Sequence, residues 1–201
     1  MIKAIISDMG NVILPFDVSL FLRKMAQYSS MKKREVMEIP VLHDRLIKSF
    51  SKGEISSKKY YESMKDAFKA DLKFKEFRNI YCDIFSLNTE VLKALTKLRG
   101  KNKLLLLSNT DTLHFNFVRK RFPEIFIFDG YILSYEAGCI KPEDEIFKLA
   151  LKKSKEEPEN TLFIDDMEEN IEAAMALGMK TIHFDSRIDL SAELEKFGVF
   201  S

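Results

Sequence analysis

Cysteine and histidine are scarce in this sequence, which has two of the first and three of the second. Cys82 and Cys139 lie far apart and form no CxxC pair, so neither a disulfide framework nor a cysteine-based metal site is indicated. The histidines His43, His114 and His183 cluster neither with one another nor with a cysteine, which argues against a zinc site.

A charge excess and a long apolar run are also lacking. Lys and Arg number 32 against 31 Asp and Glu, so a formal net charge of +1 provides no long-range attraction to nucleic acid or anionic membranes. The N-terminal apolar stretch ends at Asp8 and is too short for a signal peptide, and no other stretch could span a bilayer. We expect a cytoplasmic protein without nucleic-acid or membrane partners. No feature indicates an oligomeric state.

Short apolar runs alternate with helical patterns over much of the chain. The run at residues 4–6, ending at Asp8, predicts a buried parallel strand. Further strands are expected at 103–108, 131–134, 161–165 and 181–184, with helices between them. This alternation predicts an α/β fold with a Rossmann-like parallel sheet core and helices on both faces, although periodicity does not give the strand order.

Residues 16–85 have a different pattern. Apolar side chains such as Tyr60, Met64 and Phe68 recur at helical spacing, no strand is indicated, and Pro40 is expected to break the helical stretch. We predict an α/β catalytic core of residues 1–15 and 86–201, with an all-helical cap of residues 16–85 inserted. An insertion after the first strand overhangs the ligand crevice of an open α/β sheet, so the segment is a candidate lid.

Polar residues follow four of the expected strands: Asp8, then Ser108 and Asn109, then Lys141, then Asp165 and Asp166. The carboxyl ends of parallel strands lie along one edge, so these groups should converge. Clustered carboxylates repel unless a hard cation lies among them, and Mg²⁺ with a substrate phosphate meets that need. The Ser108 hydroxyl and the Asn109 amide are placed to bind the phosphate, and a carboxylate held against phosphorus can attack it. The expected partner is a small-molecule phosphate ester.

Four motifs together resemble the haloacid dehalogenase-like hydrolase superfamily, in the branch with a helical cap inserted after the first motif. They are Ile5-Ile6-Ser7-Asp8-Met9-Gly10-Asn11-Val12, Leu106-Leu107-Ser108-Asn109-Thr110, Lys141-Pro142, and Leu162-Phe163-Ile164-Asp165-Asp166-Met167-Glu168-Glu169-Asn170-Ile171. The Asp-x-Gly-Asn form of the first motif is similar to that of sugar-1-phosphate phosphatases. The resemblance spans nearly the whole chain.

The resemblance implies roles for the residues at the reaction centre. Asp8 would be the nucleophile and a Mg²⁺ ligand, and the backbone carbonyl of Gly10 and the carboxylate of Asp166 would be further ligands. Lys141 would orient the nucleophile and offset its charge.

The resemblance also implies supporting residues. Ser108 and Asn109 would bind the phosphoryl group, and Asp165 and Asn170 would support the metal and its waters. The product would be inorganic phosphate, released by hydrolysis of a phosphoaspartate.

One position departs from the usual pattern. Most phosphatases of this superfamily have a second Asp at the position of Gly10, which protonates the leaving group. Losing such an acid costs about 10² to 10⁴ in rate for a poor leaving group and less for a good one. The sequence therefore predicts a phosphatase for activated esters, such as anomeric sugar phosphates or acyl phosphates. Two alternatives stay open: a catalytically impaired protein that binds phosphate or a sugar phosphate, and a metal-independent 2-haloacid dehalogenase.

Overall fold

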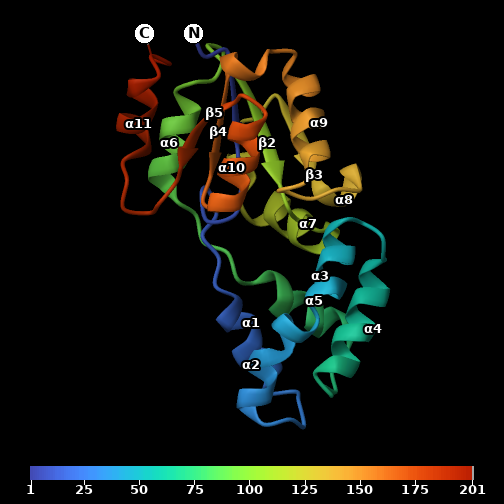
Figure 1. The fold of residues 1–201 in the computed structure, drawn as a ribbon. Helices are drawn as coiled ribbons and strands as arrows, with labels where there is room; N and C mark the ends of the chain where they lie inside the picture. The colour runs from blue at the N-terminus through green and yellow to red at the C-terminus, as the bar shows by residue number, and fades with distance from the viewer. Residues whose placement is uncertain (201) are drawn as a thin grey trace.

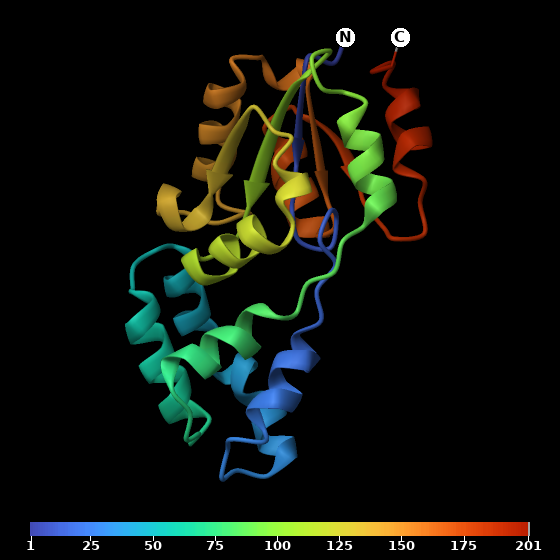
Figure 2. The same cartoon turned by 180° about the vertical axis from the view of Figure 1, so that it is seen from behind.

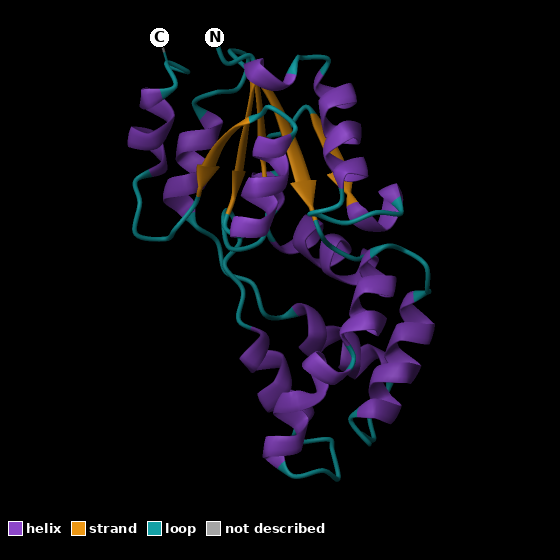
Figure 3. Ribbon diagram, in the orientation of Figure 1, coloured by secondary structure: helices purple, strands orange, loops and turns teal. Residues whose placement is uncertain are grey.

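A five-stranded parallel sheet lies at the centre of the computed structural model, which describes residues 1–200 (Figures 1 and 3). The strand order is β3-β2-β1-β4-β5, which the sequence pattern alone does not give. The strands are β1 (Ala4–Ser7), β2 (Lys103–Ser108), β3 (Gly130–Leu133), β4 (Thr161–Asp165) and β5 (Lys180–His183). The α/β class predicted from the sequence is confirmed.

The first strand is central. Ile5 of β1 pairs with Leu104 of β2 on one side and with Leu162 of β4 on the other, and all four residues of β1 are buried. Its apolar side chains therefore pack on both faces of the sheet, as expected for a strand without a solvent-facing side. Asp8 follows directly, at the edge where the strands end.

Helices cover both faces of this sheet. One face packs against α6 (Thr89–Thr96), α7 (Thr112–Arg121) and α11 (Leu190–Lys196), which are nearer the viewer in Figure 2. The opposite face packs against α9 (Asp144–Ser154) and α10 (Glu168–Ala176). A short helix, α8 (Ser134–Ala137), follows β3, and 3₁₀ turns occupy Pro123–Ile125 and Pro158–Asn160.

A second group of helices lies beyond the carboxyl ends of the strands (Figure 1). We call these helices the helical unit: α1 (Val18–Met25), α2 (Lys33–Leu42), α3 (Asp44–Ser51), α4 (Ser57–Ala67) and α5 (Phe74–Cys82). The unit has an apolar cluster of its own, in which the ring of Phe21 contacts Phe68, Phe77 and Tyr81 edge-on. The domain boundaries at residues 15 and 86 stay a prediction.

Two chain segments that run side by side connect the helical unit to the sheet. Phe16 and Phe85 form an antiparallel bridge, and the amide of Asp17 donates to the carbonyl of Ile84 at 3.0 Å. The amide of Ser86 donates to the Pro15 carbonyl at 2.8 Å. The chain therefore enters and leaves the helical unit through two adjacent segments.

The expected break at Pro40 is wrong, because Pro40 lies inside α2. A proline in a helix removes one backbone N–H and crowds the carbonyl four residues earlier. Here α2 continues only to Leu42, and His43 then separates it from α3. The interruption therefore comes a few residues after the proline. The strands expected at 103–108 and 161–165 have those bounds, and the strands expected at 131–134 and 181–184 each lie one residue earlier.

None of the helices within residues 1–200 combines the length and the apolar character needed to cross a membrane.

Candidate active site

Residues that follow β1 and β4 bring three carboxylates together. The Asp8 amide donates to the carbonyl of Ile164 at 2.8 Å, which continues the pairing of the two strands up to the acidic residues. Asp8, Asp165 and Asp166 each offer a carboxylate oxygen, and these oxygens all lie within 4.8 Å of one another. The sheet topology therefore brings together the acidic residues that the sequence places at strand ends.

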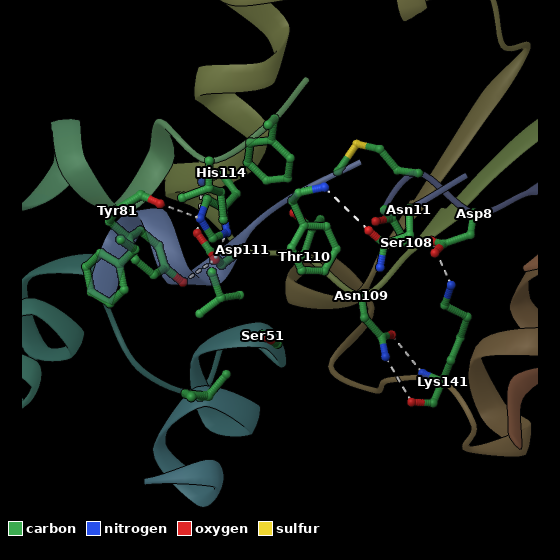
Figure 4. Close-up of a pocket in the computed structure, with 18 of the residues that line it drawn as sticks. Asp8, Asn11, Ser51, Tyr81, Ser108, Asn109, Thr110, Asp111, His114 and Lys141 are labelled. Atoms are coloured by element: carbon green, nitrogen blue, oxygen red, sulfur yellow. Dashed lines mark hydrogen bonds and ion pairs between the residues drawn. The ribbon is translucent and has the colours of Figure 1, made fainter. Parts of the chain in front are cut away.

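The ammonium of Lys141 points toward the Asp8 carboxylate (Figure 4) and also contacts Asp165. Its Nζ is 2.7 Å from Asp8 Oδ1 and 2.6 Å from Asp165 Oδ2, and it donates to the carbonyl of Leu107 at 3.3 Å. The Lys141 side chain is 1% exposed. All three ammonium protons therefore have partners, and the side chain is held in one position.

Charge in this cluster is unbalanced. The pKa of Asp8 is raised from the ordinary 3.8 to about 7, mainly by burial, with a smaller contribution from Asp165 and with Lys141 acting in the opposite direction. Burial alone lowers the pKa of Lys141, but Asp8 and Asp165 outweigh it and raise the pKa. One ammonium thus faces three carboxylates, and the site needs additional positive charge to keep Asp8 ionised.

Asn109 fixes the backbone at Lys141. Its side-chain amide donates to the Lys141 carbonyl at 2.9 Å and accepts from the Lys141 amide at 2.8 Å. These two hydrogen bonds fix the orientation of the side-chain amide, and its second Nδ2 proton and the Asn109 backbone amide remain for a phosphoryl group. Ser108, at the end of β2, is buried and lines the same cavity as Asp8.

Asp165 is fully enclosed, and Asn170 contributes to its hydrogen bonds. The second oxygen of Asp165 accepts from the amide of Met167 at 2.9 Å and from Asn170 Nδ2 at 2.8 Å. Because Nδ2 donates to the carboxylate, Asn170 Oδ1 is the remaining atom, and it is buried without a hydrogen-bond partner among the described residues. An unpaired buried oxygen in the lining of this cavity calls for a donor or a cation.

Gly10 and Asp166 line the same cavity as Lys141. Asp166 Oδ2 accepts from Asn11 Nδ2 at 3.0 Å. The Gly10 carbonyl accepts from the Val12 amide at 2.6 Å and keeps a second lone pair. A Cβ at Gly10 would lie 3.0 Å from the Phe16 ring. The space that a larger residue would need at position 10 is therefore bounded by an aromatic side chain.

Comparison with known proteins places these motifs in a family. A profile of haloacid dehalogenase-like hydrolases matches residues 2–178. The chain belongs to this family. The resemblance seen in the sequence is thereby confirmed.

Relatives of this haloacid dehalogenase-like hydrolase match over almost its whole length. A D-ribitol-5-phosphate phosphatase of Bacteroides thetaiotaomicron is 26% identical over 205 residues, which cover 96% of this chain and 97% of that protein. A crystal structure of a haloacid dehalogenase family enzyme from the same organism has a TM-score of 0.87 and 28% identity, covering 96% of this chain and 98% of that one. A complex of that wild-type enzyme with magnesium and inorganic phosphate has a TM-score of 0.82 and 26% identity, with 96% and 99% covered.

The residues of this hydrolase fit a Mg²⁺ ion. Carboxylate, carbonyl and amide oxygens are the ligands that Mg²⁺ prefers, and the cluster offers Asp8, Asp166 and the Gly10 carbonyl. Two observations support the fit: three carboxylate oxygens lie within 4.8 Å of one another, and the buried Asn170 Oδ1 lacks a hydrogen-bond partner among the described residues. The roles of the individual residues stay predictions.

The sequence did not reveal a second polar cluster, which lies between the helical unit and the sheet in the lining of the same cavity (Figure 4). Asp111 caps α7 and is 2.9 Å from Nδ1 of His114, and the Tyr81 hydroxyl donates to Asp111 at 2.9 Å. His114 Nε2 lies 3.1 Å from the Tyr81 carbonyl. A carbonyl only accepts, and so does an ionised carboxylate, so the doubly protonated, cationic form of His114 satisfies both contacts, in line with its raised pKa.

The spacing of Asp111 and His114, three residues apart at the start of an expected helix, is the only sequence signal for this cluster. Tyr81 is 30 residues before Asp111, and only tertiary packing brings it there. Because both nitrogens of His114 are occupied, the ring joins α5 to α7 and has no free position for proton transfer to a substrate.

The His114 pair predicts a pH-dependent contribution to stability. Burial alone lowers the pKa of His114, but the Asp111 carboxylate outweighs it and raises the pKa above the ordinary 6.5. A histidine whose pKa is raised by folding stabilises the folded protein fully at pH values below its pKa in the unfolded chain. This stabilisation is lost as the pH rises through its pKa in the folded protein. Hydrogen bonds to charged groups contribute about 1.5–3 kcal/mol. We expect His114→Gln to cost roughly that much in urea unfolding at pH 5.5 and clearly less at pH 9.

His43→Gln is the matched control, since His43 forms no ion pair among residues 1–200. Its effect should not change between the two pH values. A His114→Gln effect that is equal at pH 5.5 and pH 9 would contradict the charged pair.

Proposed function

We propose that this chain is a Mg²⁺-dependent phosphatase that hydrolyses a small phosphorylated molecule through a phosphoaspartate at Asp8. The observation that carries the proposal is the Asp8 carboxylate, held 2.7 Å from the buried Lys141 ammonium beside Asp166 in the lining of a cavity. The relative named as a phosphatase and the similar enzyme that binds magnesium and phosphate support it. A buried carboxylate with a fixed cation beside it is suited to nucleophilic attack.

In the proposed reaction an Asp8 oxygen forms a bond to phosphorus, and the bond from phosphorus to the ester oxygen breaks. The ester oxygen leaves with the electron pair, and water then attacks the phosphoaspartate to give inorganic phosphate and restore Asp8. Lys141 holds Asp8 in place and offsets its charge. Ser108 and the Asn109 backbone would bind the phosphoryl oxygens. Mg²⁺, when bound, supplies positive charge at the transferring phosphoryl group.

Asp8, the Gly10 carbonyl and Asp166 would hold the Mg²⁺ ion. Asp165 would support the site by holding the Lys141 ammonium, which lies 2.6 Å from its carboxylate. Asn170 would in turn hold Asp165 through their hydrogen bond. The helical unit, with predicted boundaries at residues 16 and 85, would form the cap over this site.

Gly10 affects which leaving groups can be expelled. Besides Asp8, the carboxyl groups that line the cavity are Asp111, which pairs with His114, and Asp166, which accepts from Asn11. No described residue therefore replaces the usual second aspartate as a free acid at the ester oxygen. Activated esters, including sugar 1-phosphates and acyl phosphates, should react faster than ordinary alkyl phosphates.

The deciding experiment measures phosphate release from acetyl phosphate, an aryl phosphate, and sugar 1- and 6-phosphates, with Mg²⁺ or with EDTA. We expect turnover with Mg²⁺, loss of turnover in EDTA, and recovery when Mg²⁺ is restored. Turnover that persists in EDTA would overturn the metal requirement. A folded protein that binds Mg²⁺ and phosphate without turnover would instead be a binding protein, and chloride release from 2-chloropropionate would indicate a dehalogenase.

A further inference from the structure

The cavity beside Asp8 has two chemically different sides. Its volume is about 300 Å³. The sheet side carries the charged groups Asp8, Lys141 and Asp166. The opposite side, from the helical unit and its connecting segments, is mainly apolar, with Phe16, Val18, Phe21, Ile47, Met64 and Phe85 in its lining. A phosphoryl group bound at Asp8 would therefore project its ester group toward hydrocarbon.

Few polar atoms on the apolar side are free to bind a ligand. Among the described residues of this side, the lining side chains with a polar atom are Ser51, Tyr60 and Tyr81. The Tyr81 hydroxyl donates a hydrogen bond to Asp111. Tyr60 is 1% exposed, and its ring stacks on that of Phe50 with the ring centroids 4.2 Å apart. Among the described residues of this side, only the hydroxyls of Ser51 and of the nearly enclosed Tyr60 thus remain for a ligand.

A sugar or polyol bound here would lose hydrogen bonds to water at several hydroxyl groups and regain few of them. Buried polar groups without partners weaken binding, whereas apolar groups gain by leaving water. The cavity volume corresponds to roughly ten water-sized groups, taking about 30 Å³ for each. A phosphoryl group together with about six carbon atoms would fill it.

We propose that, among phosphate monoesters of similar leaving-group reactivity, this site selects one whose ester group is apolar, of about six carbons, over a sugar or polyol phosphate. This inference rests on the phosphatase function proposed above and specifies its substrate class. The proposed substrate class differs from the polyol phosphate that gives the Bacteroides relative its name.

Binding of alkylphosphonates tests the proposal without requiring turnover. Affinities of methyl-, ethyl-, butyl- and hexylphosphonate are measured by calorimetry with Mg²⁺ present. We expect the affinity to rise about fourfold with each buried methylene until the cavity is full, from a transfer free energy of about 0.8 kcal/mol per methylene. The analogue 4-hydroxybutylphosphonate should bind more weakly than butylphosphonate. An affinity that does not change with chain length, or that increases with the hydroxyl, would overturn the proposal.

A pair of isosteric substitutions assigns the effect to the cavity. Val18 lines the cavity at the start of α1, whereas Val41 is 82% exposed on α2 and does not line it. Val18→Thr should weaken hexylphosphonate binding roughly three- to tenfold relative to methylphosphonate. Val41→Thr should leave that ratio unchanged. Equal effects of the two substitutions would contradict the assignment.

Turnover separates failure of this inference from failure of the proposed function. Hexyl phosphate and glucose 6-phosphate are both primary alkyl phosphates, so their reactivity is similar while their polarity differs. We expect kcat/KM to favour hexyl phosphate by at least tenfold. Release from acetyl phosphate together with a preference for glucose 6-phosphate would overturn the apolar substrate but keep the phosphatase. If no ester is hydrolysed, the phosphatase function fails, and phosphonate affinities still decide the chemistry of the cavity.

Discussion

An Asp8→Asn variant is expected to lose phosphate release almost completely. An amide cannot form the phosphoaspartate, and removing the nucleophile from an enzyme that works by covalent catalysis costs on the order of 10⁴-fold or more in kcat. The wild-type protein, quenched in acid during turnover, should carry a phosphoryl group on the peptide that contains Asp8. Mass spectrometry of both proteins measures this directly.

The same variant should remain folded. The pKa of Asp8 is raised to about 7, mainly by burial, from the ordinary 3.8. A carboxylate whose folded pKa is raised opposes folding at pH values above that pKa, and the opposition disappears below the unfolded value. In EDTA at pH 8, Asp8→Asn should therefore be at least as resistant to urea as the wild type, and Lys141 keeps its contact with Asp165.

Asp17→Asn serves as the control for both measurements. Asp17 is exposed, caps α1 through a hydrogen bond to the Ser19 amide, and does not line the cavity. Asparagine caps helices about as well as aspartate, so activity and stability should stay close to wild type. Retention of activity in Asp8→Asn would refute the proposed nucleophile.

Lys141→Met should have the second largest effect, on stability and activity together. Methionine keeps a chain of similar length but removes the ammonium that lies 2.7 Å from Asp8 and 2.6 Å from Asp165. Breaking a buried ion pair by removing one partner typically costs about 3–5 kcal/mol. For a chain of this size that corresponds to a fall in Tm of roughly 6–20 °C, which calorimetry in EDTA would measure. Phosphate release should fall as well, because Asp8 loses the group that holds it.

Added Mg²⁺ should raise the Tm of Lys141→Met more than that of the wild type, because the variant has the larger deficit of positive charge. Lys148→Met is the matched control. Lys148 lies on the exposed side of α9, where it pairs with Asp144, and surface pairs of this kind contribute little. If Lys141→Met melted like Lys148→Met, the charge cluster would not have the role assigned to it.

The acidic cluster could be anticipated because it depends on topology alone. Asp8, Asp165 and Lys141 follow apolar runs, and parallel strands place such positions at one edge without any knowledge of packing. The strand order could not be anticipated in this way. The pairing of β1 with both β2 and β4 joins residues about a hundred or more positions apart, and no local pattern encodes that.

Contacts that depend on packing were missed or misplaced. A proline locally favours the end of a helix, yet Pro40 lies inside α2, which ends two residues later at Leu42. The two hydrogen bonds between the Asn109 side chain and the Lys141 backbone join segments that tertiary structure brings together, and so does the contact of Tyr81 with Asp111. A residue type alone does not show which of its possible partners will be adjacent.

The central position of β1 bears on how the chain is made. Strand β1 is synthesised before its two neighbours β2 and β4, and its pairing with β4 forms only after Leu162 has been synthesised. Helices α1–α5, which have an apolar cluster of their own, need no residue of β4 to form it. Local contacts generally form before distant ones, and domains tend to fold as units during synthesis. The nascent helical unit would thus be assembled while the strand that carries Asp8 still waits for its second neighbour.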